Sequence, residues 1–220
     1  MHEILKNLIE INNEIKEKIK QFNFENYNPI IIAVSKTFKM EYISPIIDYG
    51  HLHFGENKVQ EAIEKWSSIK DNNNSIKLHM IGKLQTNKVK HAVKIFDYIH
   101  SVDSIKLAEK ISIEQKKVQK KPKIFLQVNL GNETQKSGIS VEEIHNLYNF
   151  CKKNELKIQG LMCLPPFDED SDKFFLQLKT LNQKFNLPDL SMGMSHDYLK
   201  AIKYQSTYLR IGTKIFGKRD

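Results

Sequence analysis

The stretch NPIIIAVSK, residues 28–36, is typical of a turn that leads into a β-strand buried on both faces. Five apolar residues, 30–34, follow the Asn-Pro pair, and Ser35 and Lys36 end the run. Strands that are apolar on both faces belong to parallel sheets with both sides covered. Seven further strand-like runs follow, at residues 51–54, 76–81, 98–102, 124–128, 158–164, 189–194 and 208–211.

Segments with helical spacing alternate with these strands. The first precedes them all and places an apolar residue every three or four positions, at Ile4, Leu8, Ile11, Ile15 and Ile19. Strands that alternate with helices pair in parallel through right-handed crossovers. Eight such units in 220 residues predict a compact (β/α)8 TIM-type barrel with an additional N-terminal helix. A doubly wound open sheet is the competing interpretation, because the runs at 51–54 and 98–102 are weak. The N-terminal helix is expected to be either a dimer surface or a lid over the bottom of the barrel.

The composition predicts one domain, residues 1–220, in the cytoplasm. A hydrophobic content of 40% over 220 residues supplies one sizeable core. The two cysteines, Cys151 and Cys163, form no C-x-x-C pair, so neither a disulfide framework nor a metal site is expected. No secretory signal and no apolar run of about 18 residues is present, so no membrane partner is expected.

The net charge of +8 raises the question of nucleic acid. Lysines are spread along the whole chain rather than gathered in one region, and the densest runs lie at 83–94 and 116–121. We therefore expect no nucleic-acid partner, and rather an attraction for small phosphorylated ligands.

Polar or glycine residues follow almost every predicted strand. In a barrel, the ligand-binding groups lie at the carboxyl ends of the strands and in the loops after them. The groups in those places are Ser35-Lys36-Thr37, Gly55-Glu56-Asn57, Gly82–Gln85, Asp103, Asn129 with Gly131, Pro165-Pro166, Gly193–Ser195 and Gly212-Thr213.

Lys36 is the most distinctive of them. A lysine at the end of a buried strand is costly unless its ammonium is solvated, paired or used chemically. Desolvation lowers a lysine pKa and frees the amine to attack an aldehyde, forming a Schiff base. By position alone, a lysine that extends from the barrel rim into water explains the residue equally well.

Two glycine-containing strand ends favour the reactive amine. The segments SMGMS, 191–195, and RIGT, 210–213, offer hydroxyls and unobstructed backbone N–H groups. The loops after strands 7 and 8 of a barrel commonly bind phosphate. A phosphate anchored opposite a reactive lysine is the arrangement that pyridoxal 5′-phosphate (PLP) requires.

Arg210 is a candidate partner of the cofactor ring. Alternation along 208–211 places Arg210 on one face of the strand and its neighbours on the other. An arginine that faces the barrel would donate to the pyridine nitrogen and keep it unprotonated, which makes the cofactor a weaker electron sink. The alternative is an arginine held in a salt bridge within the barrel wall.

Seven segments in the same order resemble the pyridoxal phosphate homeostasis protein family, which is related to the alanine racemase N-terminal domain. They are AVSKT (33–37), FGEN (54–57), HMIGKLQTNK (79–88), KSG (136–138), GLM (160–162), SMGMS (191–195) and RIGTKIFG (210–217). The resemblance implies a racemase-like barrel with Lys36 as the Schiff-base lysine and Arg210 at the pyridine nitrogen. It also implies that Ser195, Gly212 and Thr213 hold the phosphate, and that Asn57 and His79 line the cofactor pocket. Gln205 departs from the family, which usually has a glycine there.

The resemblance implies PLP storage without a catalytic residue, and it makes the apo forms of PLP-dependent enzymes candidate partners for delivery. Alanine racemases use a second acid–base group, a tyrosine from a C-terminal domain that is not expected here. Loss of one of two proton-transfer partners costs roughly 10²–10⁴-fold in rate. A low-activity, single-domain racemase is the alternative, and a barrel that binds another phosphorylated metabolite is a third possibility. The chain is expected to be a monomer or a weak homodimer.

Overall fold

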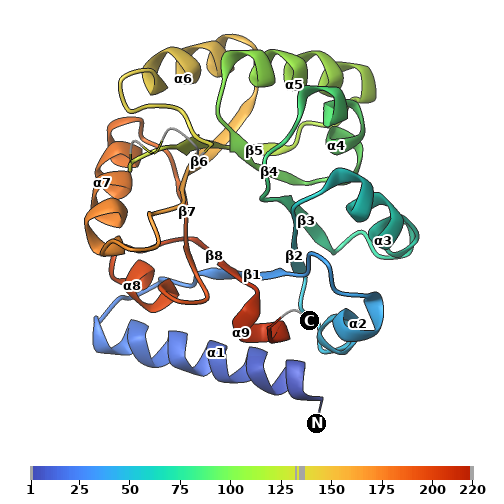
Figure 1. Ribbon diagram of the computed structural model, residues 1–220, viewed down its shortest axis with the longest axis vertical. Helices are drawn as coiled ribbons and strands as arrows, with labels where there is room; N and C mark the ends of the chain where they lie inside the picture. The colour runs from blue at the N-terminus through green and yellow to red at the C-terminus, as the bar shows by residue number, and fades with distance from the viewer. Residues whose placement is uncertain (1, 132, 134–136, 219–220) are drawn as a thin grey trace.

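The computed structural model describes residues 2–131, 133 and 137–218, and in them eight parallel strands close into a barrel (Figure 1). Each strand pairs with the next, and β1 pairs with β8 to close the circle. The (β/α)8 prediction is therefore confirmed, and the open sheet is excluded. The strands are β1 Ile30–Val34, β2 His53–Glu56, β3 Lys77–Met80, β4 Tyr98–Val102, β5 Lys123–Val128, β6 Lys157–Cys163, β7 Asp189–Met194 and β8 Tyr208–Ile211.

Helices surround the barrel, with α1 before the first strand and at least one helix after each strand (Figure 1). They are α1 Glu3–Gln21, α2 Met40–Asp48, α3 Val59–Asn72, the 3-10 helix η1 Thr86–Lys88, α4 Val89–Ile95, α5 Ile105–Val118, α6 Ile144–Lys153, α7 Ser171–Lys184, α8 Tyr198–Lys203 and α9 Thr213–Phe216. No helix of the described part of the chain is both long and apolar enough to cross a bilayer.

The structure places the second strand two residues later than the predicted range 51–54. His51 N–H donates to Ile46 O and therefore lies in the turn that follows α2. Parallel pairing with β3 begins only at His53, opposite Lys77, and continues to Glu56. Gly55 and Glu56, which the sequence suggested as a loop, therefore lie inside the strand.

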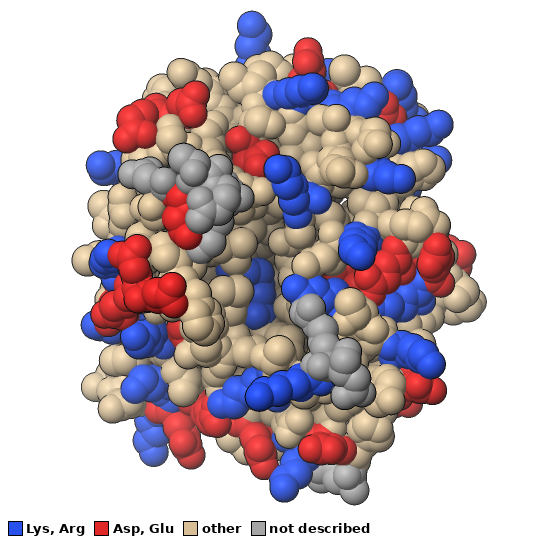
Figure 2. Space-filling view, in the orientation of Figure 1, with Lys and Arg blue, Asp and Glu red and all other residues tan. Residues whose placement is uncertain are grey.

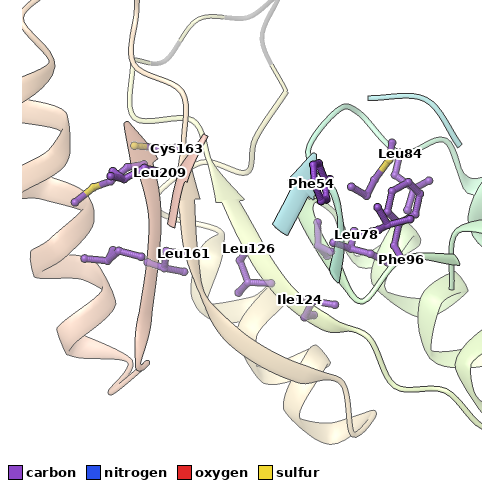
Figure 3. Close-up of a cluster of buried hydrophobic side chains, with 14 of the residues drawn as sticks. Phe54, Leu78, Leu84, Phe96, Ile124, Leu126, Leu161, Cys163 and Leu209 are labelled. Atoms are coloured by element: carbon purple, nitrogen blue, oxygen red, sulfur yellow. The ribbon is translucent and has the colours of Figure 1, made fainter. Parts of the chain in front are cut away.

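Alternating strand residues build two separate apolar layers. The larger layer lies between the strands and the helices, and Figure 3 shows part of it, including Leu126 and Leu161 on their strands. The smaller one fills the barrel itself, with Ile32, Phe125 and Tyr208 among its members. Leu209 packs outward and its neighbour Tyr208 packs inward, as the period of two along a strand requires.

Helix α1 lies against the outside of the barrel, not over its bottom (Figure 1). It packs on α2, α8 and α9, and its buried stripe includes Leu8 and Ile11. Lys214 Nζ on α9 donates to Glu14 Oε2 over 2.6 Å, and Asn7 Nδ2 donates to Ile215 O over 3.0 Å. The predicted lid is therefore wrong, and α1 instead supports the short helix that follows β8.

Candidate functional site

A cavity of about 310 Å³ opens at the carboxyl end of the barrel. Residues at or just after the ends of six strands line it, namely Val34, Lys36, Asn57, Ile81, Leu164, Met194, Ser195, His196, Arg210, Gly212 and Thr213. Figure 2 looks down the barrel and shows a hollow at the centre of the face, with Lys and Arg side chains in and around it. Six of the seven predicted site residues thus surround one cavity.

The segment that carries Lys36 is held by a buried carboxylate on the neighbouring strand. Glu56 is fully buried, and its Oε1 accepts from Ser35 Oγ at 2.7 Å and from Trp66 Nε1 at 2.9 Å. Lys65 Nζ donates to the same oxygen at 3.0 Å and to the carbonyl oxygen of Ser35 at 2.9 Å. The residue before Lys36 is therefore fixed through both its side chain and its backbone.

The residue after Lys36 is also fixed. Thr37 has a φ of 69°, in the left-handed region that a β-branched residue rarely adopts. Its backbone N–H donates to Glu61 Oε1 at 2.5 Å, and Lys65 pairs with that carboxylate at 2.9 Å. The surrounding ion pairs and hydrogen bonds maintain this conformation, which places Lys36 in the lining of the cavity.

Ser195 organises the opposite side of the cavity. Its Oγ accepts from the backbone N–H of Gly212 at 3.1 Å and of Lys214 at 3.3 Å. Its hydroxyl proton can therefore be donated to an anion beside the start of α9. Gly193 has a φ of +90°, and an added Cβ would lie 2.7 Å from the Cβ of Ala201, so the turn that leads β7 into Ser195 requires glycine.

Asn57 is positioned by close backbone contact between two loops. A Cβ added to Gly82 would lie 2.5 Å from the carbonyl oxygen of Asn57. The loops after β2 and β3 therefore pack backbone to backbone, and the side chain of Asn57 lies in the cavity lining.

Arg210 also lines this cavity. It is buried, and it donates from Nη1 to Ser191 Oγ at 2.6 Å and from Nη2 to Cys163 O at 2.8 Å. Burial lowers the pKa of its guanidinium, which nevertheless remains a cation at every physiological pH. No carboxylate among the described residues forms a salt bridge with it. The alternative of an arginine held in a salt bridge within the barrel wall is therefore wrong. A bound anion would offset this buried positive charge.

His79 is not among the described residues that line the cavity. It lies in the barrel interior, fully buried, with its Nε2 2.9 Å from His53 Nδ1 and its Nδ1 2.9 Å from His100 Nε2. Burial is the main cause that lowers its pKa well below 6.5, and this favours the neutral imidazole. Its link to the cavity runs through His100, Ser191 and Arg210.

Sequence reasoning did not single out Glu56, Lys65, His100 or Ser191. For Glu56 a signal was present in the sequence. A carboxylate at the end of a buried strand needs a cation or hydrogen-bond donors nearby. His100 and Ser191 occupy strand positions that face the interior, and the partners of such positions depend on the closure of the barrel. Of the KSG motif, Lys136 lies outside the described residues, and Ser137 O accepts from Gln127 Nε2 at 2.9 Å.

Comparison with known sequences supports one family. The family model of the alanine racemase N-terminal domain matches residues 13–220. The pyridoxal phosphate homeostasis protein of Aquifex aeolicus is 36% identical over 199 residues, which cover 86% of each chain. The pyridoxal phosphate homeostasis protein of Pasteurella multocida is also 36% identical, over 99% of this chain and 98% of that protein.

Solved structures agree in fold. PipY of Synechococcus elongatus PCC7942 with PLP bound is 33% identical, with a TM-score of 0.80 over 92% of this chain and all of that one. An alanine racemase of Clostridium difficile 630 has a TM-score of 0.72 at 14% identity, over 99% of this chain and 56% of that one. The second likeness bears on the fold alone.

Proposed function

This chain belongs to the family of pyridoxal phosphate homeostasis proteins, which share the barrel of the alanine racemase N-terminal domain, and from that premise we propose that it binds PLP on Lys36. In this proposal the protein stores the cofactor as one domain, residues 1–220, and has no efficient catalysis of its own. The single observation that carries the proposal is the cavity between Lys36 on one side and Ser195, Gly212 and Thr213 on the other.

The donor set fits the chemistry of this ligand. A primary amine lies in the lining at the end of β1, hydroxyl and backbone donors lie at the start of α9, and a buried cation lies between them. The ligand carries an aldehyde for the amine, a phosphate for the donors and a ring nitrogen that can accept from a guanidinium. The volume of about 310 Å³ is at the lower end of the usual range for ligand pockets, as a small cofactor requires.

Each residue has a distinct role in this proposal. Lys36 would hold the ligand, because its amine can condense with the aldehyde, with loss of water, to a covalent Schiff base. Ser195, Gly212 and Thr213 would bind the phosphate, with Ser195 Oγ oriented by the N–H of Gly212 so that its hydroxyl proton can be donated to the anion. Arg210 would donate to the ring nitrogen and, because a guanidinium keeps its proton, would leave that nitrogen uncharged. Asn57 lines the wall between the lysine and the ring.

Two observations favour storage over turnover. The relatives are named homeostasis proteins rather than enzymes. A cation at the ring nitrogen also weakens the electron sink that racemisation needs.

The test is a PLP titration of the apoprotein, followed by absorbance. We expect an imine band that saturates at one equivalent, that is lost in Lys36→Ala and that persists in Lys83→Ala, which removes an exposed lysine from the same end of the barrel. Mixing the holoprotein with an apo-enzyme then measures delivery. Binding of sugar phosphates in place of PLP would contradict the proposal, and conversion of L- to D-amino acids that is lost in Lys36→Ala would favour the racemase instead.

A further inference from the structure

A continuous chain of hydrogen bonds crosses the barrel interior and ends on Arg210. It runs from His53 Nδ1 to His79 Nε2 over 2.9 Å, and from His79 Nδ1 to His100 Nε2 over 2.9 Å. It continues from His100 Nδ1 to Ser191 Oγ over 2.8 Å, where Arg210 Nη1 donates over 2.6 Å. His53 starts β2 and Arg210 lines the cavity, so the chain connects the two ends of the barrel.

The three central members of this chain are shielded from solvent. His79, His100 and Ser191 are all fully buried. The ring of His79 stacks on Tyr98 with centroids 4.3 Å apart and planes 11° apart, and His100 stacks on Phe125 at 4.3 Å and 10°. These contacts fix the two imidazole planes, so each ring nitrogen keeps its partner.

Both central imidazoles are neutral. Burial is the main cause of their low pKa values, and the permanent charge of Arg210 lowers the pKa of His100 further. A neutral imidazole has one N–H and one acceptor nitrogen, so each ring accepts one hydrogen bond of the chain and donates the next.

Arg210 decides which direction that is. A guanidinium only donates, so Ser191 Oγ accepts from it and directs its own proton to the remaining partner, His100 Nδ1. His100 then carries its proton on Nε2 and donates to His79, which in turn donates from Nε2 to His53. The reverse order would leave the buried Ser191 proton without an acceptor among the described residues, at the cost of an unsatisfied buried donor.

We propose that Ser191, His100 and His79 are positioning residues that act through this one-directional chain to hold the guanidinium of Arg210 against the cavity. The chain leaves Arg210 as the one charge among its members. The effect on the cofactor rests on the proposed function, whereas the direction of the chain does not.

The apoprotein tests the direction without any cofactor. Long-range ¹H–¹⁵N spectra of histidine-labelled protein distinguish the two neutral tautomers, and single His→Gln variants assign the signals. We expect His79 and His100 to be neutral with the proton on Nε2 at pH 7, and slow hydrogen exchange at the Arg210 guanidinium. A proton on Nδ1 of either ring, or an imidazolium, would overturn the proposal.

The matched variants are Ser191→Ala and Ser101→Ala. Both remove a buried hydroxyl from a barrel strand, but Ser101 lies outside the chain. We expect Ser191→Ala to speed exchange at Arg210, to change the His100 signals, to shift the absorption maximum of the PLP complex and to raise the PLP dissociation constant about tenfold, in line with the loss of a hydrogen bond to a charged group. Ser101→Ala should leave all four unchanged.

Equal behaviour of the two serine variants in these measurements would refute the positioning role. If the protein bound no PLP at all, the proposed function would fail, while the tautomers and the exchange at Arg210 would still decide the inference.

Discussion

Ser35 and Glu56 join the ends of two adjacent strands: the hydroxyl of Ser35 donates to Glu56 Oε1 over 2.7 Å inside the fully buried wall of the barrel. Lys65 and Trp66 on α3 donate to the same oxygen. Three donors on one oxygen fix the strand end that carries Lys36, so the direction of the lysine depends on a carboxylate 20 residues away in the sequence.

Replacement of this carboxylate should damage both stability and binding. In Glu56→Gln the amide NH₂ would take the place of Oε2, which is buried and has no hydrogen-bond partner among the described residues. We expect a loss of about 2 kcal/mol in the free energy of unfolding, measured in urea, and weaker PLP binding. Glu64→Gln, on the exposed face of α3, is the control and should change neither. A Glu56→Gln protein as stable as the control would contradict the role assigned to this network.

Two glycines with positive φ separate backbone strain from steric clash. Gly193→Ala places a methyl group 2.7 Å from the Cβ of Ala201, whereas Gly50→Ala at a φ of +96° meets nothing within 4 Å. We expect Gly50→Ala to cost about 1 kcal/mol and Gly193→Ala clearly more, with weaker PLP binding only in the latter because Ser195 shifts. Thermal unfolding and PLP titration measure both. Equal losses in the two variants would argue against the close packing of the turn after β7.

The buried histidines should make the protein sensitive to mild acid. Burial lowers the pKa of His51 and of His53 to about 4, and that of His79 and His100 well below 6.5. Below pH 6.5 these histidines bind protons in the unfolded chain but not in the folded protein. Their contribution to the free energy of unfolding is therefore complete above pH 6.5 and is lost as the pH falls toward 4. Each fully buried imidazole contributes up to about 1.4 kcal/mol per pH unit.

Urea unfolding at pH 7, 6 and 5 measures this slope. His100→Gln should flatten it, and His145→Gln, on the exposed face of α6, should not. Stability that stays constant from pH 7 to pH 5 would show that these imidazoles are not held neutral.

The barrel was predictable because its signals are local. Continuous apolar runs such as 30–34 mark strands buried on both faces, and the same rule that places ligands at strand ends brought Lys36, Ser195 and Gly212 to one cavity. The prediction for β2 was two residues too early because Leu52 is apolar yet 38% exposed. Its apolar side chain therefore did not mark a buried strand position.

The interior of the barrel was not predictable in the same way. His53, His79 and His100 lie on the neighbouring strands β2, β3 and β4, whereas Ser191 on β7 meets His100 only across the interior of the closed barrel. At Gln205, by contrast, the sequence signal had a physical meaning: its φ of 59° lies in the left-handed region, which explains the glycine usual in the family.

The central claim is that Lys36 carries the cofactor. The most direct measurement is borohydride reduction of the protein after incubation with one equivalent of PLP, followed by proteolysis and mass spectrometry of the labelled peptide. The account predicts one pyridoxyl group, on Lys36, and none after Lys36→Arg, which retains the charge but has no amine to condense. A label of equal yield on another lysine in the Lys36→Arg protein, or no label in the unmodified sequence, would contradict it.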